Sequence, residues 1–294
     1  MPELPDITVY LDCLAPRILG QPVEQLVIRN PFVLRSVAPS PAEIAGARVT
    51  GLRRLGKRIV LELEGKRFVV IHLMIAGRLR WLGADAKPPG RIALVLARFP
   101  TGMMVLTEAG SKRRASLHLV HGEAALEPFT RGGLEMLETD APTFAERLRS
   151  ENHTLKRALT DPRLFSGIGN AYSDEILHRA RLSPLALTRK LDDEAVNTLF
   201  EATRATLLEW IERLRAEAGT GFPEKVTAFR EGMAVHGRYG KPCPVCGTPV
   251  QRIRYADNET NYCARCQTGG RLLADRAMSR LLRDDWPRSI DEVE

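Results

Sequence analysis

The sequence predicts a multidomain α+β protein with three parts: a β-rich N-terminal domain, a helical middle and a small cysteine-containing ribbon. Short β-rich runs follow one another from residue 23 to about residue 120, helical periodicity begins at about residue 131, and two CxxC pairs lie near the C-terminus. The 294 residues are enough for two modest domains. With 44% hydrophobic and 27% charged residues, a folded chain is expected rather than a disordered or fibrous one.

The N-terminal domain is expected to begin with a helix and to continue as antiparallel strands. Apolar residues recur at helical spacing over residues 5–19, Gly20 ends the helix, and Pro16 should kink it. Six β-rich runs follow, and the turn residues at 64–66 and 100–102 are typical of hairpins. Because no helices separate these runs, we expect an antiparallel sandwich or barrel. The runs are Val23–Ile28, Ile59–Leu63, Phe68–Leu73, Ile92–Phe99, Met103–Thr107 and Leu117–Val120.

The middle of the chain is expected to be helical. Its longest helix runs from about Asp193 to Ala216, with Asp192 as the N-cap and apolar residues along one face. Shorter helices are expected over Phe144–Arg149, Leu155–Leu159 and Ala171–Arg179. Near the C-terminus, strands are expected at Val250–Tyr255 and before Tyr262, followed by a helix over Leu272–Leu282 and an acidic tail that ends at Glu294.

Four of the five cysteines form two CxxC pairs, Cys243 with Cys246 and Cys263 with Cys266, separated by sixteen residues. This spacing matches the four-thiolate zinc template, in which each pair offers two sulfurs to a tetrahedral ion. Because all four positions are filled, we expect one structural Zn²⁺. A disulfide pair or a redox CxxC explains neither the two copies nor a chain whose start lacks an export signal. Cys13 is expected to be a buried small hydrophobe.

The chain is basic, which favours a polyanionic partner. Lys plus Arg number 43 against 36 Asp plus Glu, giving a formal net charge of +7 and a pI near 9.4. No apolar run approaches the ~20 residues that a membrane-spanning helix needs. The first residues lack the basic and apolar regions of a signal peptide. We therefore expect a cytoplasmic protein without a membrane partner.

Pro2 and Glu3 are the first candidates for chemistry. Methionine before proline is normally removed, which exposes the secondary amine of Pro2, and an α-amino group with a reference pKa of ~7.7–8.0 is partly uncharged near neutral pH. Such an amine can attack a masked aldehyde and form an iminium, and Glu3 beside it can move protons. A simpler interpretation stays open, in which the proline only reflects processing and the acidic residue favours a helix start.

Other candidates lie in basic or glycine-containing turns. Lys57 precedes an apolar strand within the cationic stretch 48–58, and Lys112-Arg113-Arg114 forms a second basic cluster. Together they indicate a phosphate-facing surface, although an exposed basic hairpin also explains Lys57. Gly167-Ile168-Gly169-Asn170 places backbone amides at a helix start, where a phosphate can bind, but helix packing alone often requires such glycines. His72, inside an apolar strand, is interpreted as a core residue.

Taken together, these motifs resemble the formamidopyrimidine-DNA glycosylase family, also called the Fpg/Nei family. Four features occur in family order between Met1 and about Gln267, and this order is much more specific than any single motif. They are Pro2-Glu3-Leu4-Pro5, Gly56-Lys57-Arg58, the run from Gly167 to Glu175, and the four-cysteine finger. The resemblance implies an N-terminal antiparallel β-sandwich with flanking helices over 1–125, a helix–two-turn–helix domain over 131–225 and a zinc finger over 236–268. An extension, 269–294, has no counterpart in short family members.

The resemblance implies a bifunctional base-excision-repair DNA glycosylase with AP lyase activity. Its partner would be double-stranded DNA containing damaged bases or abasic sites, with the damaged nucleotide flipped out of the stack. By resemblance, the Pro2 nitrogen attacks the sugar and expels the base, Glu3 protonates the ring oxygen, and Lys57 contacts a phosphate near the lesion. The resulting Schiff base permits β,δ-elimination. Lys156 and Asn170 match positions that hold phosphates or approach the lesion, and we expect a nucleoid-associated monomer.

Departures from the family pattern affect how DNA is read. Asn258 stands where a finger arginine is usual, so one phosphate contact is lost or moves to another arginine, such as Arg252, Arg254 or Arg265. Ile75 stands where a methionine usually fills the space left by the flipped nucleotide, next to Met74 at a usual glycine. Arg113 can still reach the partner base, but Ala115 replaces the usual aromatic residue. The segment 219–237 is also short for a lesion-capping loop.

Two other functional classes stay open. A catalytically silent damage- or structure-specific DNA-binding protein on this scaffold explains the altered reading residues, but it does not explain intact Pro2, Glu3 and Lys57. A zinc-ribbon and helix module that binds RNA or ribosomes leaves the Pro2-Glu3 start unexplained. Within the enzyme class, the sequence does not choose among 8-oxoguanine, formamidopyrimidines, oxidised pyrimidines, abasic sites and single-stranded substrates.

Overall fold

The chain divides into two compact units. The computed structural model describes residues 1–294 except 111, 224–225, 227–228, 256–257, 275 and 293–294, so the end of the acidic tail lies outside the described residues. The first unit comprises Met1–Arg131 and Trp210–Thr227, and the second comprises Gly132–Glu209 and Ala228–Glu294. None of the described helices combines the length and the apolar character that crossing a bilayer requires.

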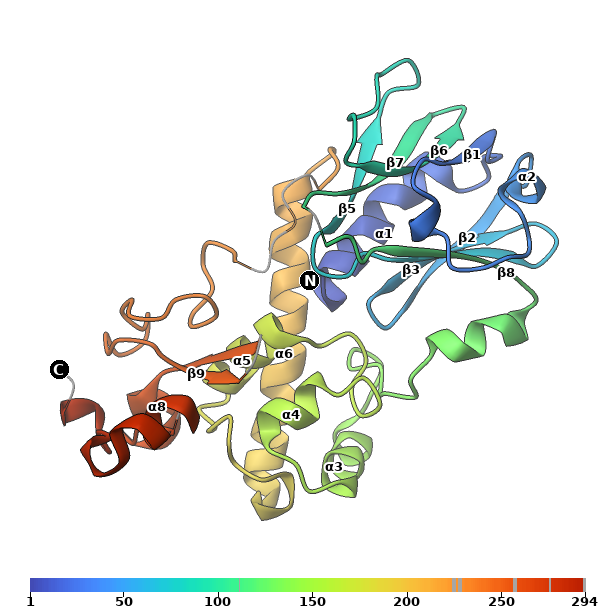
Figure 1. Cartoon of the computed structure of the whole chain (residues 1–294). Coiled ribbons are helices and arrows are strands. Elements are labelled where there is room, and N and C mark those ends of the chain that lie inside the picture. The colour runs from blue at the N-terminus through green and yellow to red at the C-terminus, as the bar shows by residue number, and fades with distance from the viewer. Residues whose placement is uncertain (111, 224–225, 227–228, 256–257, 275, 293–294) are drawn as a thin grey trace. The chain divides into compact units, whose positions relative to one another are not determined.

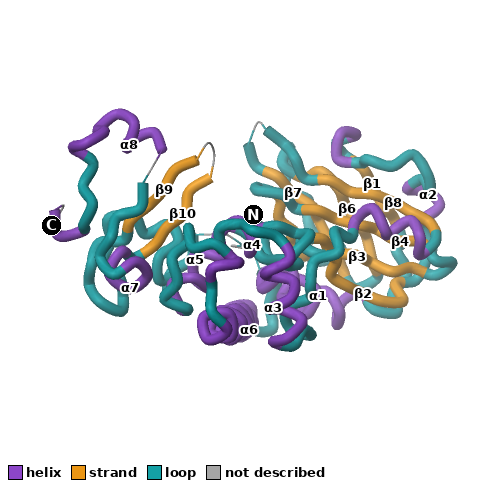
Figure 2. The backbone as a smooth tube through the Cα atoms, turned by 90° about the horizontal axis from the view of Figure 1, so that it is seen from below, coloured by secondary structure: helices purple, strands orange, loops and turns teal. Residues whose placement is uncertain are grey.

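The first unit contains two four-stranded antiparallel sheets. The strands are β1 Gln25–Ile28, β2 Val49–Leu55, β3 Arg58–Leu63, β4 Arg67–His72, β5 Gly77–Leu82, β6 Ala93–Phe99, β7 Gly102–Glu108 and β8 Ser116–His121. One sheet has the order β1-β6-β7-β5 and the other the order β2-β3-β4-β8, and Figure 2 shows these strands in orange. The predicted turns at 64–66 and 100–102 connect β3 to β4 and β6 to β7.

Both sheets share one core with helix α1, Leu4–Ile18. Ile7, Tyr10 and Leu14, spaced three and four residues apart, are fully buried in a cluster that includes residues of both sheets. Figure 1 shows α1 beside β2 and β3, which it contacts. A short helix, α2 (Pro41–Ile44), packs against β1. The predicted antiparallel sandwich and N-terminal helix are therefore confirmed, and Pro16 does not end the helix.

The sequence did not predict two strands, β2 and β5. Both are edge strands of their sheets, so each has a neighbouring strand on one side only. Five of the seven β2 residues are only partly buried, Arg53 and Arg54 among them, and β5 carries Arg78 and Arg80. Edge strands tolerate this charge because one side of each faces no partner strand. Their residues therefore lack the continuous apolar run that marked the central strands.

The second unit begins with helices around an aromatic core. These are α3 Ala141–Ser150, α4 Leu155–Thr160, α5 Asn170–Arg179 and α6 Asp193–Ala218, and the end of α6 belongs to the first unit. Phe144 lies 5.0 Å from Phe165 and 5.5 Å from Phe200, measured between ring centroids. The predicted N-cap of α6 is confirmed, because the Ala195 N–H donates to Asp192 Oδ1 at 2.8 Å.

The cysteine-containing part of the second unit is a loop, a hairpin and a short helix. The hairpin pairs β9, Gln251–Tyr255, with β10, Asn258–Tyr262, and α7, Ala264–Thr268, follows it. Val235 and Val250 are fully buried in a cluster with three of the cysteines. We refer to residues 234–268 as the finger.

The extension after residue 269 packs against the finger. Its helix α8, Arg276–Leu282, begins four residues later than predicted, because the Leu272 N–H donates to Arg288 O at 2.9 Å and this pairing holds residue 272 outside the helix. Leu273 and Ile290 are buried in a cluster with Tyr262. The Leu273 N–H donates to the Tyr262 hydroxyl at 2.8 Å, and burial raises the pKa of Tyr262 to about 12.

Tyr262→Phe should destabilise the second unit, because it leaves the buried Leu273 N–H without its acceptor. The expected loss is about 1–3 kcal/mol in the free energy of unfolding, measured by urea denaturation. Tyr239→Phe is the control, because the Tyr239 side chain is half exposed and should cost less than about 0.5 kcal/mol. Equal losses in the two variants would show that the extension gains nothing from this hydrogen bond.

Candidate functional site

The N-terminus of the first unit is buried among charged groups. Pro2 is buried and Met1 half-buried. The terminal amine belongs to Met1 in this chain, and burial lowers its pKa, with Arg78 and Lys57 lowering it further and Glu3 opposing the change. Removal of Met1 would make the Pro2 nitrogen the terminal amine in the same surroundings. A larger fraction of such an amine is uncharged at neutral pH than of an exposed one, which favours a nucleophile.

Glu3 is also buried, and it begins α1. Glu3 is 2% exposed and belongs to a capping box with Asp6, whose Oδ2 accepts the Glu3 N–H at 2.8 Å. The interpretation that Glu3 favours a helix start is therefore confirmed. The same arrangement holds the carboxylate directly beside Pro2, so the capping role and a proton-transfer role do not exclude each other.

Lys57 lies in the tight turn between β2 and β3. Leu55 pairs with Arg58 across the turn, so Gly56 and Lys57 alone connect the two strands. Gly56 has a φ of +60°, which favours glycine, and its carbonyl accepts a hydrogen bond from Arg54 Nη1 at 2.9 Å. The Lys57 charge acts on the terminal amine, which places these two candidates in one electrostatic environment.

Ile75 is presented by a turn that Arg78 holds in place. The Ile75 side chain is 61% exposed, and Met74 before it adopts a φ of +53°, where glycine is normally preferred. Arg78 Nη1 donates to the carbonyl oxygens of Ile75 at 3.0 Å and Gly77 at 2.7 Å. A Cβ at Gly77 would lie 2.3 Å from Leu73 O, so this turn closes only around glycine. Sequence reasoning missed Arg78, because one arginine on an edge strand gives no motif.

Arg113 lies in an exposed loop that a buried carboxylate shapes. Glu108, 1% exposed, accepts hydrogen bonds from the backbone N–H groups of Arg114 and Ala115, at distances between 2.9 and 3.0 Å. Arg113 Nη2 donates to Arg91 O at 2.9 Å. Glu108 therefore positions this loop, and the sequence analysis did not single it out, because the predicted strand ended at Thr107.

His72 differs from its interpretation as a core residue. It ends β4 and is half-buried, opposite Arg58 in the neighbouring strand. Burial, together with the charges of Arg58 and Lys57, lowers the pKa of His72 to about 4. The imidazole is therefore neutral at physiological pH.

In the second unit, Asn170 and Lys156 meet at the start of α5. Asn170 is its first residue, and its Nδ2 donates to Glu259 O in β10 at 2.8 Å. Lys156 on α4 is only 9% exposed, and its Nζ donates to Asn170 O at 2.7 Å and to Asp174 Oδ1 at 2.5 Å. The Asp174 carboxylate thus compensates the Lys156 charge inside the unit. The hydrogen bond from Lys156 to the Asn170 carbonyl also supports the turn at residues 167–170, which we call the Asn170 turn.

Asp174 and Glu175 join α5 to the finger. Asp174 is 1% exposed. Its Oδ2 lies within hydrogen-bond distance of His236 Nδ1, at 2.8 Å, and accepts the Asn261 N–H at 3.2 Å. Glu175 accepts the backbone N–H groups of residues 234, 235 and 236 at 2.7 to 3.0 Å. Burial raises the pKa of Glu175, against the effect of these hydrogen bonds. Sequence analysis included both carboxylates only as part of a motif, because α5 contains many polar residues and its burial is evident only in the structure.

Asn258 is exposed at the start of β10. Of the three arginines considered as its replacement, Arg265 is bound to Asp291 of the extension at 2.5 Å. Arg252 lies 4.0 Å from the Tyr239 ring centroid. The Arg254 side chain is 60% exposed, although Glu259 lies 3.4 Å away, so Arg254 is the most accessible of the three.

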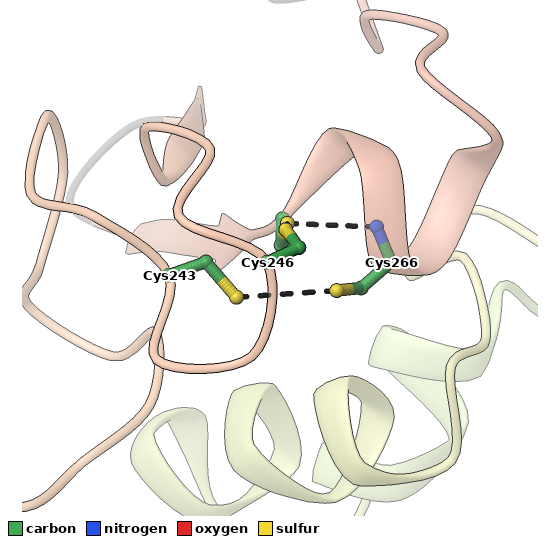
Figure 3. A group of neighbouring side chains, drawn as sticks. Cys243, Cys246 and Cys266 are labelled. Carbon is green, nitrogen blue, oxygen red and sulfur yellow. Dashed lines mark hydrogen bonds between the residues drawn. The ribbon is translucent and has the colours of Figure 1, made fainter.

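The four cysteines converge as the spacing predicted. Figure 3 shows Cys243, Cys246 and Cys266 facing one another, and the four sulfur atoms lie within 4.8 Å. Cys243 and Cys266 are 3.9 Å apart, and Cys246 and Cys263 are 3.4 Å apart, measured between sulfurs. Tetrahedral zinc with bonds of about 2.3 Å requires sulfurs about 3.8 Å apart, so the donor set fits the ion. Desolvation raises the pKa of the exposed Cys246, but hydrogen bonds from Thr248 oppose this and lower the pKa to about 6.

The structure distributes the predicted residues over both units. Pro2, Glu3, Lys57, Ile75 and Arg113 belong to the first unit. Lys156, Asn170, Asn258 and the four cysteines belong to the second. Within each unit the candidates are held by hydrogen bonds or by shared charge.

Three family models match consecutive parts of the chain. They are the formamidopyrimidine-DNA glycosylase N-terminal domain at residues 1–115, the formamidopyrimidine-DNA glycosylase H2TH domain at 133–220, and the zinc finger found in FPG and IleRS at 240–269. The extension begins where the third match ends.

Curated relatives and solved structures agree with these matches. The chain is 34% identical to a formamidopyrimidine-DNA glycosylase from Thermus thermophilus over 285 residues, covering 92% of this chain and all of that one. It is 42% identical over 151 residues to an uncharacterized formamidopyrimidine-DNA glycosylase-like protein from Mycobacterium tuberculosis, covering 51% of this chain and 94% of that one. A crystal structure of the MutM (Fpg) protein from Thermus thermophilus superposes with a TM-score of 0.75 at 32% identity, covering 90% of this chain and 98% of that one.

A second solved structure contains DNA. It is a mutant Fpg from Lactococcus lactis in complex with a Fapy-dG-containing DNA, with a TM-score of 0.79 and 25% identity, covering 91% of this chain and all of that one. On these grounds the chain belongs to the formamidopyrimidine-DNA glycosylase family, and the expected fold is confirmed.

Glu175→Gln should weaken the attachment of the finger to α5. The amide keeps one oxygen but turns an NH₂ group toward buried backbone N–H donors, so we expect a loss of about 1–3 kcal/mol in the free energy of unfolding of the second unit. Hydrogen exchange of the amides at 234–236 should accelerate in parallel. The matched control is Glu201→Gln, an exposed position on α6, and equal effects of the two changes would contradict the role of Glu175.

His72 should make the first unit less stable in acid. The unfolded imidazole takes up its proton near pH 6.5, whereas the folded one does so only near pH 4. Stability is therefore fully present above pH 6.5 and is lost as the pH falls to about 4, by about 1–3 kcal/mol. In His72→Gln, the free energy of unfolding measured with urea should depend less on pH in this window. His121→Gln, at an exposed position, should keep the pH dependence of the wild type. An unchanged slope in His72→Gln would contradict this assignment.

Proposed function

We propose that the protein is a base-excision-repair DNA glycosylase with AP lyase activity, acting through an amine at Pro2. The observation that supports it most is the buried N-terminus, where the charges of two carboxylates and two cations act on the terminal amine. Membership of the glycosylase family makes DNA the expected substrate. The family resemblance and this local chemistry point to the same residues independently.

In the first step, the bond between the sugar and the damaged base is replaced by a bond between the sugar and Pro2. With Met1 removed, the uncharged Pro2 nitrogen attacks C1′ of a flipped nucleotide, a C1′–N bond forms, and the bond to the damaged base breaks. The Pro2 nitrogen loses its proton on forming this bond, and the departing base takes up one proton, so the step balances. Glu3 gives a proton to the ring oxygen, the sugar opens, and the C1′–N bond becomes an iminium.

The iminium then permits strand cleavage. It withdraws electrons from the sugar, so a proton at C2′ becomes acidic and its loss expels the 3′ phosphate. A second proton loss, at C4′, expels the 5′ phosphate, and water releases the remaining sugar fragment from Pro2. Glu3 is placed to move protons in these steps, and the Lys57 charge favours the departing phosphate.

Each unit carries candidate residues for DNA contacts. In the first, Lys57 and Arg113 offer positive charge and Ile75 offers an exposed apolar side chain for the space left by the flipped nucleotide. In the second, the Asn170 turn and Arg254 are the candidates for phosphate contacts. Lys156 contributes indirectly, by holding the Asn170 turn. The complex of the Lactococcus lactis Fpg mutant with a Fapy-dG-containing DNA supports damaged DNA as the partner.

The four cysteines would hold one structural zinc ion. Zinc would fix the loop that carries Cys243 against the hairpin and α7. No step of the reaction needs the ion.

Borohydride trapping on duplexes tests the proposed chemistry. With an abasic site, the reductant should convert the iminium to a stable protein–DNA adduct, seen as a band of lower mobility in a denaturing gel. A variant with one extra residue before Pro2 should form no adduct, because its proline nitrogen stays in a peptide bond. Glu3→Gln should slow base excision by about 10²–10⁴-fold.

Parallel duplexes should carry 8-oxoguanine, a formamidopyrimidine or an oxidised pyrimidine, which reports the lesion preference. Glu64→Gln, in the exposed turn between β3 and β4, is the control for the loss of a carboxylate. Tight binding of damaged DNA without any adduct would instead identify a silent DNA-binding protein. An adduct that persists in the extended variant would exclude Pro2 as the nucleophile.

A further inference from the structure

One face of α5 contacts the finger at three levels. Asn170, Asp174 and His178 are four residues apart, so their side chains lie along the same face of the helix. Asn170 reaches Glu259 O, and Asp174 reaches His236 and the Asn261 N–H. At the third level, His178 Nε2 lies 3.2 Å from Cys243 Sγ, which is within hydrogen-bond distance for sulfur.

The His178 contact is buried and polar. His178 is 6% exposed and Cys243 is 3% exposed, so water cannot replace either partner easily. A cysteine that binds zinc has lost its proton, and its sulfur can then only accept hydrogen bonds. The hydrogen must therefore lie on Nε2, which determines the tautomer of the imidazole.

We propose that His178 is a positioning residue for the zinc ligand Cys243, donating its Nε2–H to the thiolate and so linking metal binding in the finger to α5. This inference rests on the zinc occupancy proposed above. The same helix begins at Asn170, so the metal site and the candidate phosphate-binding turn lie at opposite ends of one rigid element.

Other sulfurs of the cluster also receive hydrogen bonds. Cys263 Sγ accepts the Cys266 N–H at 3.5 Å, and Cys246 is bonded by Thr248. These donors belong to the finger itself, whereas His178 comes from the helical part of the unit. A hydrogen-bond partner that orients a metal ligand and stabilises its deprotonated form typically contributes about 10–100-fold to metal affinity.

Zinc release from the full-length protein tests the inference. The wild type, His178→Phe and His178→Gln are loaded with Zn²⁺, and release to excess EDTA is followed with a chromogenic zinc indicator. His178→Phe keeps the ring volume but removes the donor, so release should accelerate about 10–100-fold. His178→Gln places an N–H at a similar reach and should restore most of the retention. His153→Phe, at a partly buried histidine bonded to Glu151, is the matched control and should behave like the wild type.

A second measurement uses only the wild type, so its result does not depend on whether the variants fold. In the zinc-loaded protein, ¹⁵N chemical shifts of the imidazole should show His178 Nε2 protonated and Nδ1 unprotonated. Nε2 without a proton, or equal zinc release from the wild type and His178→Phe, would overturn the inference. A wild type that binds no zinc at all would refute the proposed metal site instead, so the two failures are distinguishable.

Discussion

Two adjacent carboxylates on α5, Asp174 and Glu175, hold together the second unit of this protein. Asp174 forms hydrogen bonds with the Lys156 ammonium, the His236 imidazole and one backbone N–H. Glu175 accepts hydrogen bonds from three backbone N–H groups of the finger. Buried carboxylates are costly unless every oxygen is satisfied, and here the satisfying groups come from three different segments. The finger therefore has one well-defined position on α5, and with it the hairpin that carries Asn258 and Arg254.

The first unit depends on a different constraint, the burial of the chain's own start. The capping box of α1 holds Glu3 beside Pro2, and the β2–β3 turn brings the charge of Lys57 to the terminal amine. A terminus that simply began a helix would not need this burial. The arrangement combines a capped helix start with a terminal amine of lowered pKa, and a lowered pKa favours the uncharged, nucleophilic form of an amine.

Much of the fold and of the candidate site was predictable from local sequence patterns. The central strands, the helices and the cysteine cluster follow from apolar periodicity and from the CxxC spacing, which directly reflect burial and tetrahedral geometry. What the sequence could not predict depends on contacts that leave no repeating pattern along the chain. The edge strands β2 and β5 lack an apolar run, Glu108 acts on residues six and seven positions later, and Lys156 is neutralised by Asp174. Asn170, Asp174 and His178 did carry a signal, since polar residues at four-residue spacing mark one helix face.

The most direct test of the account is the identity of the residue that bears the sugar after reduction. The full-length protein is reduced with borohydride on an abasic duplex, digested with nuclease and trypsin, and mapped by mass spectrometry. We predict a sugar fragment attached to the nitrogen of Pro2, in a peptide that runs from Pro2 to Arg17 and lacks Met1. A fragment on Lys57 or another lysine, or an N-terminal peptide that retains Met1 in an active protein, would contradict the account.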